Sequence, residues 1–136
     1  MHIATLVTDV LKIVEVLRDR RGDLVLAMLY NSTEGATSSW NLIISAPWAD
    51  KLGVVEATRA ITHELSLGLS LENRSAISRV TVLKTIDPFV RDMTGLFQVS
   101  DPTTRLPISN VAPDGIPVGS GYVFYSQPTL LAQIPT

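Results

Sequence analysis

The chain has 136 residues, of which 46% are apolar and only 18% are charged, and its formal net charge is −2. This length predicts one domain spanning 1–136. The composition excludes a disordered protein, which would be charged and poor in aliphatic residues. The absence of cysteine excludes a disulfide scaffold, a cysteine zinc site and a thiol nucleophile. The acidic balance argues against nucleic-acid binding through a broad basic face.

The N-terminal stretch 3–17 is mostly aliphatic, but Asp9, Lys12 and Glu15 interrupt it. No uninterrupted apolar run approaches the ~18 residues of a membrane span. We therefore expect a cytoplasmic protein without a membrane segment. The mean hydropathy of +0.26 favours burial of surplus apolar surface against a second copy of the chain, so a homo-oligomer, first of all a dimer, is expected.

The first predicted element is an amphipathic helix, because seven aliphatic residues recur at helical spacing within 3–17. Arg18, Arg20 and Arg21 crowd its last turn, where cations interact favourably with the helix dipole. Gly22 follows, as glycine commonly does at a helix end. The arginines have this structural explanation, and contact with an anion or nucleic acid is the alternative.

Two strands joined by a short loop are predicted next. Residues 24–30 form a continuous apolar run, which is typical of a strand covered on both faces. The stretch 32–39 is small and polar, and 40–46 is the second strand, which Pro47 ends. This pattern indicates a hairpin.

One long helix is expected from Asp50, which resembles a helix N-cap. Its apolar face comprises Leu52, Val55, Ile61, Leu65 and Leu69. A short helix capped by Ser70 follows, then a strand over 79–84 and a helix that begins at Asp87-Pro88.

The composition changes near Ser100, since six of the eight prolines lie in 101–136. This segment is expected to be extended, with one strand at 118–125, and to pack on its own core (1–100) or on a partner subunit. The sequence thus predicts an α+β fold: a mixed β-sheet with a central hairpin, an N-terminal helix, one long helix, and an extended proline-rich C-terminal segment with one strand.

Residues 22–85 resemble a minimal nucleotidyltransferase domain. That family has a strand ending in Gly-Ser, a small polar loop, and a strand that begins with two carboxylates. Here Asn31-Ser32 stands in place of Gly-Ser, while Ser39 and Asn41 occupy the carboxylate positions. Neutral side chains cannot hold the Mg²⁺ ions of the family's chemistry. The resemblance therefore implies a catalytically degenerate domain that retains binding of a nucleotide or small ligand.

Familiar catalytic patterns are missing from the sequence. Only His2 and His63 could act as a base, and no GxSxG motif is present. The acidic residues fall at predicted caps, helix surfaces and loops rather than as a pair on one strand. We expect no catalytic residue, metal or cofactor. An enzyme with an unfamiliar site near Trp48, Asp50 and His63 is an alternative.

Trp40 and Trp48 bracket the second predicted strand. The two rings could close the core with satisfied N–H groups, form the rim of a ligand site, or belong to an interface. The candidate ligand- or partner-binding residues are Asn31, Ser32, Trp40, Asn41, Trp48, Asp50 and His63. The leading hypothesis is a non-enzymatic domain that self-associates and binds a protein partner.

Overall fold

The computed structural model describes residues 3–33, 39–100 and 105–128. The elements follow one another as α1 (Ile3–Arg21), β1 (Leu26–Asn31), β2 (Trp40–Ser45), α2 (Pro47–Leu52), α3 (Val54–Gly68), α4 (Leu71–Ala76), β3 (Ile77–Val82), α5 (Pro88–Leu96), β4 (Leu106–Val111), the short 3-10 helix η1 (Pro113–Gly115) and β5 (Val118–Ser126). The strands form one sheet in the order β3-β2-β1-β5-β4. β2 and β3 are parallel, and the other neighbours are antiparallel. The α+β class, the mixed sheet and the central hairpin are confirmed.

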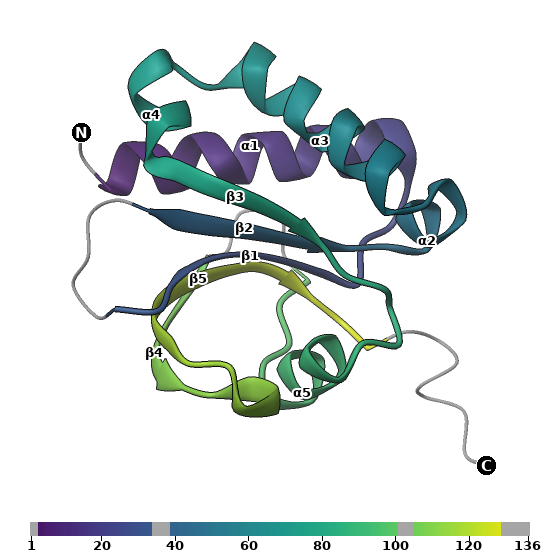
Figure 1. The fold of residues 1–136 in the computed structure, drawn as a ribbon, viewed down its shortest axis with the longest axis vertical. Helices are drawn as coiled ribbons and strands as arrows, with labels where there is room; N and C mark the ends of the chain where they lie inside the picture. The colour runs from purple at the N-terminus through teal and green to yellow at the C-terminus, as the bar shows by residue number, and fades with distance from the viewer. Residues whose placement is uncertain (1–2, 34–38, 101–104, 129–136) are drawn as a thin grey trace.

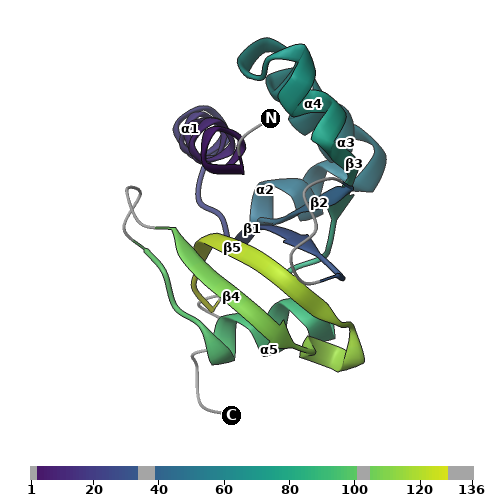
Figure 2. The ribbon, with the colours of Figure 1, turned by 90° about the vertical axis from the view of Figure 1, so that its left-hand side faces the viewer.

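The sheet separates two hydrophobic cores. Helices α1, α3 and α4 lie on one face, and α5 lies on the other (Figures 1 and 2). β1 contributes to both cores, since Ala27 and Leu29 pack with α1 and α3, whereas Leu26 and Met28 pack with α5. The continuous apolar run of β1 is therefore buried on both faces, as predicted.

The arginines at the end of α1 all contact neighbouring side chains. Arg18 lies 4.5 Å from the ring centroid of Tyr125, Arg20 pairs with Glu64 at 3.0 Å, and Arg21 lies 6.0 Å from the ring centroid of Trp48. These contacts join α1 to β5, α3 and α2. They support the structural explanation of the arginine cluster.

The prediction that Asp50 caps a helix is wrong. Helix α2 begins at Pro47 and has Ala46 as its N-cap, so Asp50 lies inside the helix. Its carboxylate instead accepts hydrogen bonds from the backbone N–H of Thr85 at 3.2 Å and from the Thr85 hydroxyl at 2.6 Å. Asp50 thereby holds the turn after β3 against α2.

The long helix is divided by Gly53, whose φ of 91° lies in the left-handed region that favours glycine. The division changes the direction of the chain between α2 and α3. Leu52 and Val55 are consequently 42% and 69% exposed, contrary to the predicted apolar face. Ile61 and Leu65 lie in the core, as predicted.

Two predicted helix starts are confirmed. The Ser70 side chain accepts a hydrogen bond from the backbone N–H of Asn73 at 3.1 Å, and the Asp87 carboxylate accepts one from the N–H of Phe89 at 2.8 Å. These caps begin α4 and α5. The strand predicted over 79–84 is observed as β3, two residues earlier.

The C-terminal segment contributes two strands to the sheet rather than one. β5 pairs with β1 on one side and with β4 on the other. β4 contains Pro107, which an edge strand tolerates because one side of its backbone is unpaired. Phe124 of β5 is 1% exposed. We expected a compact core up to residue 100 and an extended segment after it. The sheet instead contains strands from both sides of residue 100.

Candidate functional site

The candidate residues from the sequence do not form one cluster. Asn31, Ser32, Trp40 and Asn41 lie where the hairpin loop meets β1 and β2, Trp48 and Asp50 lie in α2, and His63 is exposed on α3. The first group and α2 are separated by the length of β2, about 17–20 Å for a strand of this size. Among the described residues, no hydrogen bond or ring contact joins His63 to Asp50 or Trp48.

Both tryptophans pack inward. Trp40 is 2% exposed, and its ring centroid lies 6.2 Å from that of Tyr122. Trp48 is half-buried beneath Arg21. The N–H groups of both indoles are buried and have no hydrogen-bond partner among the described residues. Trp40 therefore fills the core. Its indole N–H has no hydrogen-bond partner among the described residues, whereas the sequence predicts one for a core tryptophan.

Three polar side chains form a row across the sheet. Tyr30 of β1 pairs in register with Asn41 of β2, and Asn41 pairs with Arg79 of β3. Directly opposed residues share a face of the sheet, and this is the face that carries α5. The Asn41 amide donates to the Tyr30 hydroxyl at 3.3 Å and accepts from the Thr81 hydroxyl at 3.0 Å.

A polar hollow of about 180 Å³ lies beside this row. Tyr30, Asn31, Ser32, Asn41, Ser78 and Arg79 line it. Asn31 holds the two ends of the hairpin loop together. Its amide donates to the Ser39 carbonyl at 3.3 Å, and its carbonyl accepts from the Thr33 N–H at 2.9 Å. The hollow brings together three candidates from the sequence: Asn31, Ser32 and Asn41.

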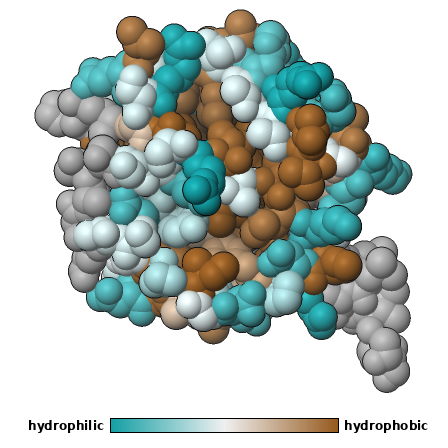
Figure 3. Space-filling model, in the orientation of Figure 1, coloured by the Kyte–Doolittle hydropathy of each residue, from teal (hydrophilic) through white to brown (hydrophobic). Residues whose placement is uncertain are grey.

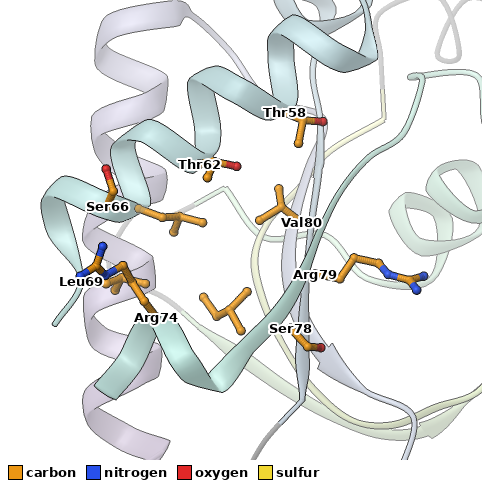
Figure 4. Close-up of a pocket in the computed structure, with 10 residues that line it drawn as sticks. Thr58, Thr62, Ser66, Leu69, Arg74, Ser78, Arg79 and Val80 are labelled. Atoms are coloured by element: carbon orange, nitrogen blue, oxygen red, sulfur yellow. The ribbon is translucent and has the colours of Figure 1, made fainter. Parts of the chain in front are cut away.

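An apolar groove of about 310 Å³ lies between α3 and β3 (Figure 4). Its apolar lining consists of Leu65, Leu69, Ile77 and Val80. Thr58, Thr62 and Ser66 recur at every fourth position along the α3 side, and Arg74 lies at the α4 end. Figure 3 shows hydrophobic residues gathered along this hollowed part of the surface.

β3 presents an open edge next to the groove. It is the outermost strand on its side and pairs with β2 alone among the described strands. The N–H of Leu83 donates to the carbonyl of Ile44 at 3.0 Å. In a parallel pair, the backbone N–H and C=O groups of successive residues point alternately toward the partner strand and away from it. Because the N–H of Leu83 points toward β2, the backbone groups of Val80 and Val82 point toward the free edge. Such an edge can pair with another chain.

Tyr30, Thr62 and Arg79 were not among the candidates from the sequence. The alternation in 79–84 indicates a strand, but it carries no signal for parallel pairing with β2. That pairing, rather than any local motif, places Arg79 beside Asn41.

No family model, no curated protein and no solved structure matches the chain. The resemblance to nucleotidyltransferase domains therefore stays an expectation from the sequence. In the part of the chain that the structure describes, no group of three or more His, Asp or Glu side chains could hold a metal ion. None of the described helices combines the length and apolar character needed to cross a membrane.

Proposed function

We propose that this protein is a non-catalytic binding domain that takes up an extended segment of a protein partner along β3. The observation that carries the proposal is that the free edge of β3 borders the apolar groove of α3. A segment added to a sheet gains affinity from main-chain hydrogen bonds. It gains specificity from side chains that enter pockets at alternate positions. The β3 edge and the groove supply these two components.

The two faces of β3 define the chemistry of the partner segment. Alternate side chains of an added strand face opposite sides of the sheet. Those on the α3 side meet the groove lined by Leu65 and Val80, which favours apolar residues. Those on the other side lie near Arg79, which points away from α3 (Figure 4) and has no acidic partner among the described residues. The segment therefore alternates apolar and acidic residues.

Thr62 provides a test of this site, since it is exposed and lines the groove. Thr62→Trp is expected to fill the groove and to weaken binding of alternating apolar-acidic peptides, selected from a displayed library, by at least about tenfold. His63→Trp places the same ring at the next position of α3, outside the groove, and should bind as the wild type does. Fluorescence anisotropy with labelled peptides measures both affinities.

Two results would refute the proposal. One is a selection that enriches no alternating peptide. The other is equal peptide affinity for Thr62→Trp and His63→Trp, with unchanged circular dichroism of both variants.

We infer further that the domain self-associates through apolar side chains at the junction of α2 and α3. Leu52, Val54 and Val55 are 42%, 50% and 69% exposed. Ile86 is 73% exposed. It follows Thr85, whose hydrogen bonds to Asp50 hold this turn beside α2. Figure 3 places hydrophobic surface over the start of α3. Contiguous exposed apolar residues of this kind are typical of interaction surfaces.

Val55→Asp is expected to convert a dimer into a monomer, and so to halve the mass measured by light scattering during gel filtration. A carboxylate in the first turn of α3 suits the helix dipole, so the fold should be retained. Leu71→Asp, at another exposed apolar residue, is the control and should stay dimeric. A wild-type protein that is monomeric at micromolar concentration would contradict self-association.

A further inference from the structure

A directed chain of hydrogen bonds crosses the sheet on the face opposite the groove. The Thr81 hydroxyl donates to the Asn41 carbonyl oxygen at 3.0 Å, and the Asn41 amide donates to the Tyr30 hydroxyl at 3.3 Å. The Tyr30 oxygen is thus used as an acceptor, which leaves its own proton to be donated into the polar hollow. Hydrogen bonds in such a chain polarise one another, so the last donor is strengthened.

Tyr30 is held in place by its two neighbours. Its ring centroid lies 6.3 Å from that of Phe89 on one side, and its register partner on β5 is Gly121. A Cβ at Gly121 would lie 3.3 Å from the Tyr30 Cβ and 3.2 Å from the Leu29 carbonyl oxygen, so glycine permits this close approach. A fixed hydroxyl donor loses little conformational entropy when it binds a ligand.

Arg79 adds a positive charge on the other side of Asn41. Its guanidinium has no ion pair among the described residues, whereas Arg20 and Arg59 each pair with a glutamate. The planar guanidinium group matches the geometry of a carboxylate or phosphate and can donate two hydrogen bonds to it. Tyr30 and Arg79 thus flank the fixed amide of Asn41. The hydroxyl of Tyr30 and the guanidinium of Arg79 donate no side-chain hydrogen bond to any of the described residues.

The size and the lining of the hollow define the ligand class. A volume of about 180 Å³ corresponds to roughly six water molecules. This space suits one phosphate or carboxylate group with a small attached group. The described residues that line the hollow carry hydroxyls, amides and one guanidinium, and none of them is acidic. Among these described residues, an anion meets donors and no like charge.

We propose that this hollow is a binding site for a small metabolite that carries a phosphate or carboxylate group, held between the Tyr30 hydroxyl and the Arg79 guanidinium. The site lies on the opposite face of β3 from the apolar lining of the peptide groove, and Ser78 and Arg79 border both. The proposal does not rest on the function proposed for that groove, because the anion is tested without any peptide.

Titrations followed by amide NMR, with inorganic phosphate and separately with propionate at matched ionic strength, test the site. We expect at least one of the two anions to give saturable shifts around Tyr30, Asn41 and Arg79. Arg79→Gln should raise the dissociation constant at least about tenfold, and Tyr30→Phe should raise it severalfold. Arg91→Gln removes another exposed arginine, on α5, and should leave the titration unchanged.

The response to the two anions identifies the source of the ligand group. Saturation with phosphate alone assigns a phosphate ester, saturation with propionate alone assigns a carboxylate, and saturation with both supports the shared chemistry. Absence of saturation with either anion would overturn the proposal, as would an equal affinity of Arg79→Gln and Arg91→Gln. Thr62→Trp changes the groove and should bind the anions as the wild type does. If this variant lost anion binding, the assignment of the site to this hollow would be contradicted.

Discussion

Replacement of Phe124 by alanine is expected to destabilise the protein by about 3–5 kcal/mol. Phe124 is 1% exposed and packs in the core that α1 and α3 form with the sheet. Its strand, β5, lies between β1 and β4. The loss is a large part of the roughly 5–15 kcal/mol that stabilises a typical domain. Urea denaturation followed by circular dichroism measures it.

Ile116→Ala is the matched control for this substitution. Ile116 belongs to the same C-terminal segment but is 39% exposed, so its truncation should cost less than about 1 kcal/mol. If Phe124→Ala costs no more than Ile116→Ala, the C-terminal segment does not contribute to the core as the structure describes.

Trp40→Ala is expected to cost about 3–5 kcal/mol as well, because it removes a large side chain that is 2% exposed. Trp40→Phe should cost less than about 2 kcal/mol, since the indole N–H has no partner among the described residues and its removal breaks no hydrogen bond. Chemical denaturation of both variants, followed by circular dichroism, measures the difference.

The comparison separates two roles of Trp40. A phenylalanine variant that is much more stable than the alanine variant indicates that the ring fills space. Equal destabilisation by the two substitutions would show that the N–H itself makes an important interaction, contrary to the packing described above.

Local signals explain the parts of the fold that the sequence predicts well. The apolar runs of β1 and β2 are long enough to indicate two buried strands. Ser70 and Asp87 are side chains that cap helices through bonds to residues two or three positions away. These interactions depend on neighbours in the chain, so a single sequence contains the information.

Two kinds of feature are harder to predict from the sequence. One is an apolar spacing that continues across a break in a helix, and the other is a strand that depends on pairing with a distant part of the chain. The apolar spacing of Leu52 and Val55 continues through Gly53, although Gly53 divides the helix there. β4 was not expected because Pro107 disfavours a strand, and only its position at the sheet edge makes the proline acceptable.

The sequence predicts only part of the candidate site, because the rest depends on pairing between distant strands. Asn31, Ser32 and Asn41 follow from the hairpin, which is local. Arg79 joins them through the parallel pairing of β2 with β3, across α2, α3 and α4. The groove likewise requires the packing of α3 beside the edge of β3.

The central claim is that a partner segment adds to the free edge of β3. Amide hydrogen exchange with and without a selected alternating peptide tests it most directly. The N–H groups of Val80 and Val82 face the free edge, so their exchange should slow at least about tenfold in the complex. A complex that forms with unchanged exchange at both amides would contradict strand addition at β3.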